Sequence, residues 1–148
     1  MTRRELREHC FKLLFCADFY PAEEMTEQLD QYFIQPEEEE GTPAEGYEIL
    51  HNPALDAYDG EYVKEKVEHI MEKISDLDSQ INKIAEGWTT KRMGKEDLTI
   101  LRLALYEILY DDDDVPDKVA INEAVELAKK FGGDDSPSFI NGILAKLV

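Results

Sequence analysis

The chain has 148 residues, 43% of them hydrophobic, and its 34 acidic and 16 basic residues give a formal charge of -18. This length suits one domain with a sizeable core, and the negative charge repels nucleic acids and anionic membranes at long range. No apolar run is long enough to cross a bilayer, and the charged start MTRRELREHC has no apolar signal core behind it. We therefore expect a cytoplasmic protein that does not bind membranes.

The first segment predicts an amphipathic helix over residues 3 to 18. Thr2 and Glu5 have the spacing of a capping box. The apolar residues that follow at helical spacing are Leu6, Cys10, Leu13, Leu14 and Ala17. Cys10 and Cys16 point to different faces of this helix, which predicts two reduced thiols rather than a disulfide.

The middle of the chain changes character. A second helix is expected to open at Pro21 and to end before Pro36. Residues 35 to 59 then combine Pro, Gly and a run of four Glu without sustained periodicity, which indicates an acidic, flexible connection.

Helical spacing returns at Glu61 and continues, with a bend at a cap near Ser75, to about residue 85. A further helix is expected from about residue 95 to 110, and the acidic run 111 to 114 lies beyond its end. The next helix stops at Gly132 or Gly133. The last one has Ser136 as its cap and Pro137 at its first helical position. No strand-like alternation competes, so we predict an all-α fold of six to seven helices.

The start of the first helix is basic. Arg3, Arg4 and Arg7 share one face by the i, i+3 and i+4 rule. The helix dipole adds partial positive charge there, so guanidinium groups and exposed N–H groups could hold phosphates together. The alternative is a solvated face on which Glu5 and Glu8 are the ionic partners.

The stretch SFINGIL, residues 138 to 144, places Asn141 and Gly142 inside a helical pattern, where Gly costs about 1 kcal/mol relative to Ala. We expect the last helix to cross the first helix closely at Gly142, with Asn141 bonding the neighbouring helix. Gly142→Leu should then cost about 1–3 kcal/mol through overpacking. Asn122 is interpreted in the same way, as a buried amide that bonds across helices.

The sequence contains no residue pattern that favours catalysis or metal binding. His9 and Cys10 are adjacent, so they point about 100° apart on a helix and do not form a nucleophile–base pair. The acidic runs Glu37 to Glu40 and Asp111 to Asp114 lack the spaced ligands and the turn glycine of a calcium loop. We expect no enzyme activity, no metal and no cofactor.

Three segments together resemble the NusB family of bacterial transcription antitermination factors. They are RRELREHCFKLLF, LRLALYEILY and VPDKVAINEAVELAKKFGGDDSPSFINGILAKL. The resemblance covers the N-terminal helix and essentially everything after about residue 95. It implies one NusB-like RNA-binding domain over residues 1–148, built from two small helical subdomains.

The family binds the boxA element of nascent ribosomal RNA jointly with the ribosomal protein NusE, and so helps the RNA polymerase antitermination complex read through termination signals. The resemblance places RNA contacts on Arg3, Arg4, Arg7, Asp135 and Phe139, and partner contacts on the helix with Asp97, Leu98 and Arg102. One family arginine position holds Glu5 here. Cations and aromatic faces are also what single-stranded RNA binding requires.

Two other functions stay open. An acidic adapter could dock a basic ribosomal or transcription partner without its own RNA contact. A NusB-like module of an RNA methyltransferase is a weaker alternative, because no cofactor-binding domain follows Val148.

Overall fold

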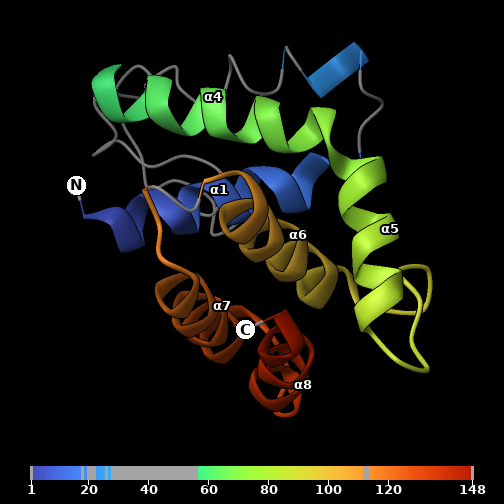
Figure 1. Ribbon diagram of the computed structural model, residues 1–148. Coiled ribbons are helices and arrows are strands. Elements are labelled where there is room, and N and C mark those ends of the chain that lie inside the picture. Colours follow the sequence, from blue (N-terminus) through green and yellow to red (C-terminus); the bar gives the residue numbers. More distant parts are fainter. Residues whose placement is uncertain are drawn as a thin grey trace, which may run out of the picture. The chain divides into compact units, whose positions relative to one another are not determined.

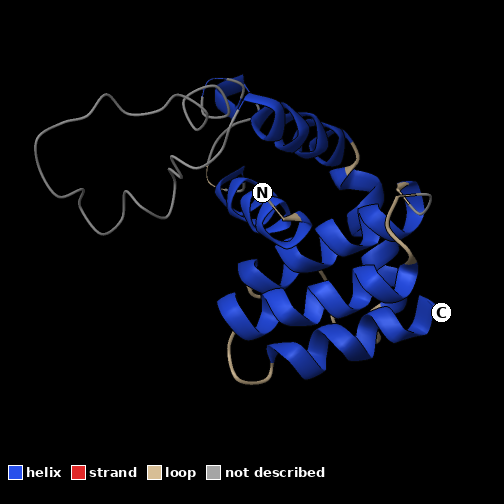
Figure 2. Ribbon diagram, turned by 90° about the vertical axis from the view of Figure 1, so that its left-hand side faces the viewer, coloured by secondary structure: helices blue, strands red, loops and turns tan. Residues whose placement is uncertain are grey.

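The computed structural model describes residues 2–17, 19, 23–25, 27, 57–111 and 114–147. Among these residues are six α-helices described along their length, a few helical residues at 23–25 and 27, and a terminal 3-10 helix, and none of them lies in a β-strand (Figures 1 and 2). The chain divides into two compact units, Met1–Glu68 and His69–Val148. The predicted all-α class is confirmed, and the two units agree with the two expected helical subdomains.

The N-terminal unit contains α1, Arg3–Ala17, and most of α4, Ala57–Glu72. Helix α1 buries Cys10, Leu13 and Leu14 of the predicted apolar stripe and also Phe11, whereas Leu6 and Ala17 of that stripe are half-buried. The Thr2 half of the predicted capping box is confirmed, because its Oγ1 accepts a hydrogen bond from the Glu5 N–H at 3.1 Å. This bond satisfies one of the backbone donors that a helix start leaves without an intrahelical partner.

Helix α4 starts earlier than its sequence pattern suggested. The acidic connection was expected to reach residue 59, but α4 begins at Ala57. Asp59 and Gly60 are turn-forming residue types, yet both are buried inside the helix. The rest of that connection lies outside the described residues. Of the second predicted helix, residues 23–25 and 27 are described, and they are helical.

The C-terminal unit is built around α6, Lys95–Tyr110. This helix packs against α5, Ile74–Ile84, against α7, Asp117–Phe131, and against α8, Ser136–Leu144. The 3-10 helix η1, Ala145–Leu147, follows α8 directly. Every residue from Leu98 to Ile108 is buried, so α6 has no solvated face along its middle and forms the core of the unit.

Most helix ends lie where the sequence placed them. Helix α6 ends at Tyr110 with Asp111 as its cap, so the acidic run lies beyond the helix, and Gly132 caps α7 as predicted. The cap of α8 is Asp135 rather than Ser136. The break after α4 falls at Lys73, before Ser75, so Ser75 is not the cap of α5, and no side chain caps the start of this helix.

Candidate functional site

The basic start of α1 is only partly exposed. Arg3 and Arg4 are exposed, whereas Arg7 is 6% exposed and belongs to the buried side of the helix together with Cys10 and Phe11. The predicted face of three accessible arginines is therefore wrong for Arg7. Position 7 lies one turn before Cys10 and Phe11, so the packing that buries those two residues also encloses the arginine.

His9 and Cys10 on α1 are both buried, and Cys10 and Cys16 are both free thiols, as predicted. Burial, followed by the positive charge of Lys12, lowers the pKa of His9 below its ordinary value. Burial raises the pKa of Cys16, which favours the protonated thiol. His9 and Cys10 are therefore part of the packed side of α1, whereas Cys16 is only partly buried.

Phe139 lies in the first turn of α8, one turn after Asp135, which is exposed. Its ring contacts the ring of Trp88, with centroids 5.5 Å apart and planes inclined by 46°. Trp88 comes from the loop between α5 and α6 and remains 51% exposed. The sequence reasoning missed Trp88, although an aromatic residue inside the basic stretch GWTTKRMGK was the signal that could have found it.

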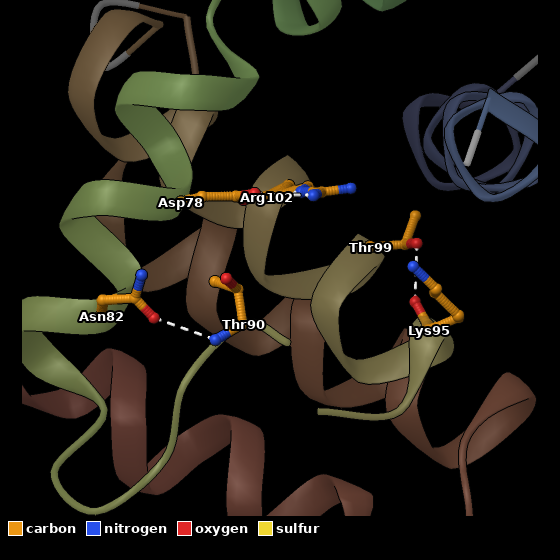
Figure 3. A network of polar contacts seen from close by, with 6 residues as sticks. All are labelled: Asp78, Asn82, Thr90, Lys95, Thr99 and Arg102. Carbon is orange, nitrogen blue, oxygen red and sulfur yellow. Dashed lines mark hydrogen bonds and ion pairs between the residues drawn. The ribbon is translucent and has the colours of Figure 1, made fainter. Parts of the chain in front are cut away.

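The loop that carries Trp88 is anchored at several points. The Thr90 N–H donates a hydrogen bond to Oδ1 of Asn82 at 2.9 Å (Figure 3). Gly87 has a φ of 79°, a left-handed conformation that favours glycine and turns the chain after α5. The Nζ of Lys146 donates to the Ile84 carbonyl at 3.0 Å, which ties the end of α5 to the segment after α8.

Asn122, Asn141 and Gly142 are not the buried crossing residues that the sequence suggested. All three are exposed. Asn122 and Asn141 line a surface groove of about 500 Å³ between α7 and α8. A Cβ built on Gly142 meets nothing within 4 Å, so the expected close approach is wrong, and with it the expected overpacking by Gly142→Leu.

A close approach exists instead at Gly132, in the turn before α8. A Cβ built there would lie 2.5 Å from Ser136 Cβ and 2.8 Å from the Ala128 carbonyl oxygen. Ser136 has a second role in this turn, because its Oγ accepts a hydrogen bond from the Gly133 N–H at 3.0 Å. The close approach therefore requires a glycine at position 132, in the turn between α7 and α8.

The helix assigned to partner binding is mostly committed to the core. Leu98 is 3% exposed and Arg102 is 7% exposed. The Nε and Nη2 atoms of Arg102 each donate to one carboxylate oxygen of Asp78 at 2.7 Å, which clamps α6 to α5 (Figure 3). Asp97 is half-buried, and its Oδ1 is buried with no hydrogen-bond partner among the described residues.

The described parts of the chain hold no group of three or more His, Cys, Asp or Glu side chains that could bind a metal ion. The Glu37 to Glu40 run lies outside the described residues, as do Asp112 and Asp113. None of the helices described is long and apolar enough to cross a membrane.

Known proteins resemble this chain over its whole length. The model of the NusB family matches residues 4–148. The transcription antitermination protein NusB of Lachnoclostridium phytofermentans is 44% identical over 153 residues, which cover 100% of this chain and 99% of that protein.

Solved structures agree in fold. NusB from T. maritima superimposes with a TM-score of 0.76 at 29% identity, covering 99% of this chain and 90% of its own. A chain from the crystal structure of antitermination factors NusB and NusE in complex with double-stranded RNA gives a TM-score of 0.68. It is 22% identical and covers 98% of this chain and 94% of its own, which is a likeness of fold alone.

Proposed function

The chain belongs to the NusB family, and from this premise we propose that it binds boxA-type single-stranded RNA of nascent ribosomal RNA together with the ribosomal protein NusE. By doing so it helps RNA polymerase read through termination signals. The observation that carries the proposal is the match to NusB proteins along essentially the whole chain. No catalytic step is part of the proposal.

Two surfaces support RNA contact. Arg3 and Arg4 are exposed in the first turn of α1, where the helix dipole also favours an anion. Phe139 is half-exposed at the start of α8 and offers an aromatic ring, with Asp135 one turn before it. That these two surfaces form one RNA site stays a prediction. Because Arg7 is buried, we assign it to the packing of α1 rather than to phosphate contact.

The start of α6 is the proposed NusE contact. Asp97 is half-buried in the first turn of α6 beside the exposed Glu96, and this local negative charge favours a basic partner. Leu98 and Arg102 hold α6 in place from within the unit instead of touching the partner. A formal charge of -18 favours a basic ribosomal protein over bare RNA as the first partner.

The same charge and the burial of Arg7 favour the second candidate, an acidic adapter that docks a basic partner without contacting RNA itself. The two functions differ in what happens when Arg3 and Arg4 are removed. Only direct phosphate contact makes RNA affinity depend on these two side chains.

The test measures binding of a fluorescently labelled boxA-like single-stranded RNA at several salt concentrations, with and without NusE. We expect weak binding alone and tighter binding with NusE. Replacing Arg3 and Arg4 with Ala should weaken binding and flatten the slope of log affinity against log salt by about 1.4, at about 0.7 per phosphate.

The matched control replaces Lys118 and Lys129 with Ala, two exposed lysines of α7 whose removal changes the net charge by the same amount. It should leave the slope nearly unchanged. A double arginine variant with unaltered affinity and slope in the NusE complex would support the adapter instead.

A further inference from the structure

Trp88 and Phe139 form an aromatic pair at the surface of the C-terminal unit. They come from separate elements, the α5–α6 loop and α8, and their centroids lie 5.5 Å apart. Trp88 is the single tryptophan of the chain and leaves half of its surface to solvent. Burial would stabilise this large ring further, so its exposure beside a second aromatic ring suggests a ligand with a flat apolar face.

Gly142 lies three residues after Phe139 and therefore on the same face of α8. A Cβ at this position would meet nothing within 4 Å, so the glycine leaves open space beside Phe139 rather than room for another helix. A helix-interior glycine that no packing requires still destabilises the helix relative to alanine. Space for an approaching ligand would explain why a glycine is kept at this position despite that cost.

The stretch of sequence that begins at Trp88 is basic, whereas the chain as a whole is acidic. Residues 88 to 95, WTTKRMGK, contain Lys91, Arg92 and Lys95 and no carboxylate. All three cations are exposed. Acidic residues flank this stretch in the sequence, because Glu86 precedes it and Glu96 and Asp97 follow Lys95 directly. Of these, Glu86 forms an ion pair with Lys146. Aromatic rings next to cations are the combination that binds single-stranded nucleic acid.

The site is also held in place. The Asn82–Thr90 hydrogen bond, the left-handed turn at Gly87 and the Lys146–Ile84 hydrogen bond fix the loop on both sides of Trp88. A ring that is already positioned loses little conformational entropy when a base stacks on it.

We propose that Trp88 and Phe139 together form a base-stacking surface for single-stranded RNA, in which Gly142 leaves room for the base and Lys91 and Arg92 contact the neighbouring phosphates. This inference rests on the proposed function, because it assigns a further binding residue and a glycine role to the same RNA site. It adds Trp88, which the family resemblance did not supply.

Because Trp88 is the single tryptophan, its fluorescence reports directly on this surface. The full chain with NusE is titrated with a labelled boxA-like single-stranded RNA, while label anisotropy reports binding and tryptophan emission reports stacking. NusE contributions are subtracted by a matched titration with the Trp88→Phe variant. We expect RNA to quench Trp88 emission and to protect the ring from acrylamide.

This titration distinguishes a failure of the stacking surface from a failure of the proposed RNA-binding function. Saturable RNA binding with unchanged Trp88 emission and acrylamide access would overturn the stacking surface and leave the proposed function standing. Absence of RNA binding, with and without NusE, would overturn both.

Substitutions at Trp88 distinguish base stacking from the general loss of an exposed apolar side chain. Trp88→Ala should weaken RNA binding at least about fivefold with an unchanged salt slope, whereas Trp88→Phe should retain most of the affinity. Leu109→Ala is the matched control, because it removes an exposed apolar side chain at the opposite end of α6 from this loop. Equal affinities for Trp88→Ala and Leu109→Ala would contradict the assignment.

Gly142→Ala separates an effect on RNA binding from an effect on stability, because its Cβ fills the space proposed for the base. It should weaken RNA binding while raising the melting temperature. Asn141→Ala changes the neighbouring position, which lines the α7–α8 groove, and should leave RNA binding unchanged. Unaltered RNA affinity in Gly142→Ala would remove the glycine from the proposal.

Discussion

The turn that leads into α8 and the face of α8 that carries Phe139 each contain a glycine in very different surroundings. At Gly132 a Cβ would collide with Ser136 and the Ala128 carbonyl, whereas at Gly142 it would meet nothing within 4 Å. The sequence pattern had suggested a close approach at Gly142. A glycine in the sequence therefore does not reveal whether neighbouring atoms of the fold occupy its Cβ position, as at Gly132, or leave that position open, as at Gly142.

Two arginines of the same unit differ in a similar way. Arg102 is buried and makes two hydrogen bonds to Asp78, whereas Arg92 in the loop before α6 is exposed. The first fixes α6 against α5, and the second is free to take part in binding a phosphate. The inner positions of the C-terminal unit are committed to stability, and the outer ones around Trp88 and Phe139 leave room for a ligand.

The largest expected effect is on the inner side. Arg102→Ala leaves the Asp78 carboxylate poorly solvated and without its partner, so it should reduce the free energy of unfolding by about 3 kcal/mol, measured by urea denaturation. Replacing both residues, Arg102→Met with Asp78→Leu, should restore most of the loss because no unpaired charge remains. A single variant as stable as the parent protein would show that the clamp contributes little.

Gly132→Ala should come next, with a loss of about 1–3 kcal/mol, because the added methyl group collides with Ser136 and the Ala128 carbonyl. Thermal unfolding provides the measurement. Gly133→Ala is the matched control, since the adjacent glycine has open space around its Cβ position and a φ outside the left-handed region. If both substitutions have the same effect, the close approach at Gly132 does not matter energetically.

The smallest effect is expected at Gly142, and it has the opposite sign. Gly142→Ala should raise the free energy of unfolding by about 0.5–1 kcal/mol, because Ala has the higher helix propensity and the added carbon meets no neighbour. Calorimetric melting of the two proteins measures the difference. A clear loss of stability would restore the interpretation of this position as a helix crossing.

Helix positions were largely predictable because they follow from local patterns. The Thr2 and Glu5 spacing predicted a cap that the structure contains, and the end of α7 was predicted at Gly132 or Gly133, of which Gly132 is the cap. The start of α4 was misjudged because Asp59 and Gly60 have turn-forming side chains, and burial of both outweighs that local preference.

The candidate site was predicted less completely. Phe139 and Asp135 were assigned through family resemblance, and the structure places them one turn apart at the start of α8. Trp88 was missed, since its contact with Phe139 joins segments far apart in the sequence. Arg7 was assigned to an exposed face by helical spacing alone, which gives the direction of a side chain around its helix but not what covers that direction.

By itself the sequence determined the all-α class, most of the helix ends, the two free cysteines and the family, because spacing, capping residues and long matching segments are properties of the chain. Only the tertiary structure decided which of its polar and glycine residues are committed to packing. Burial of Arg7 and Arg102, the close approach at Gly132 and the open space at Gly142 depend on neighbours that the chain brings together only by folding.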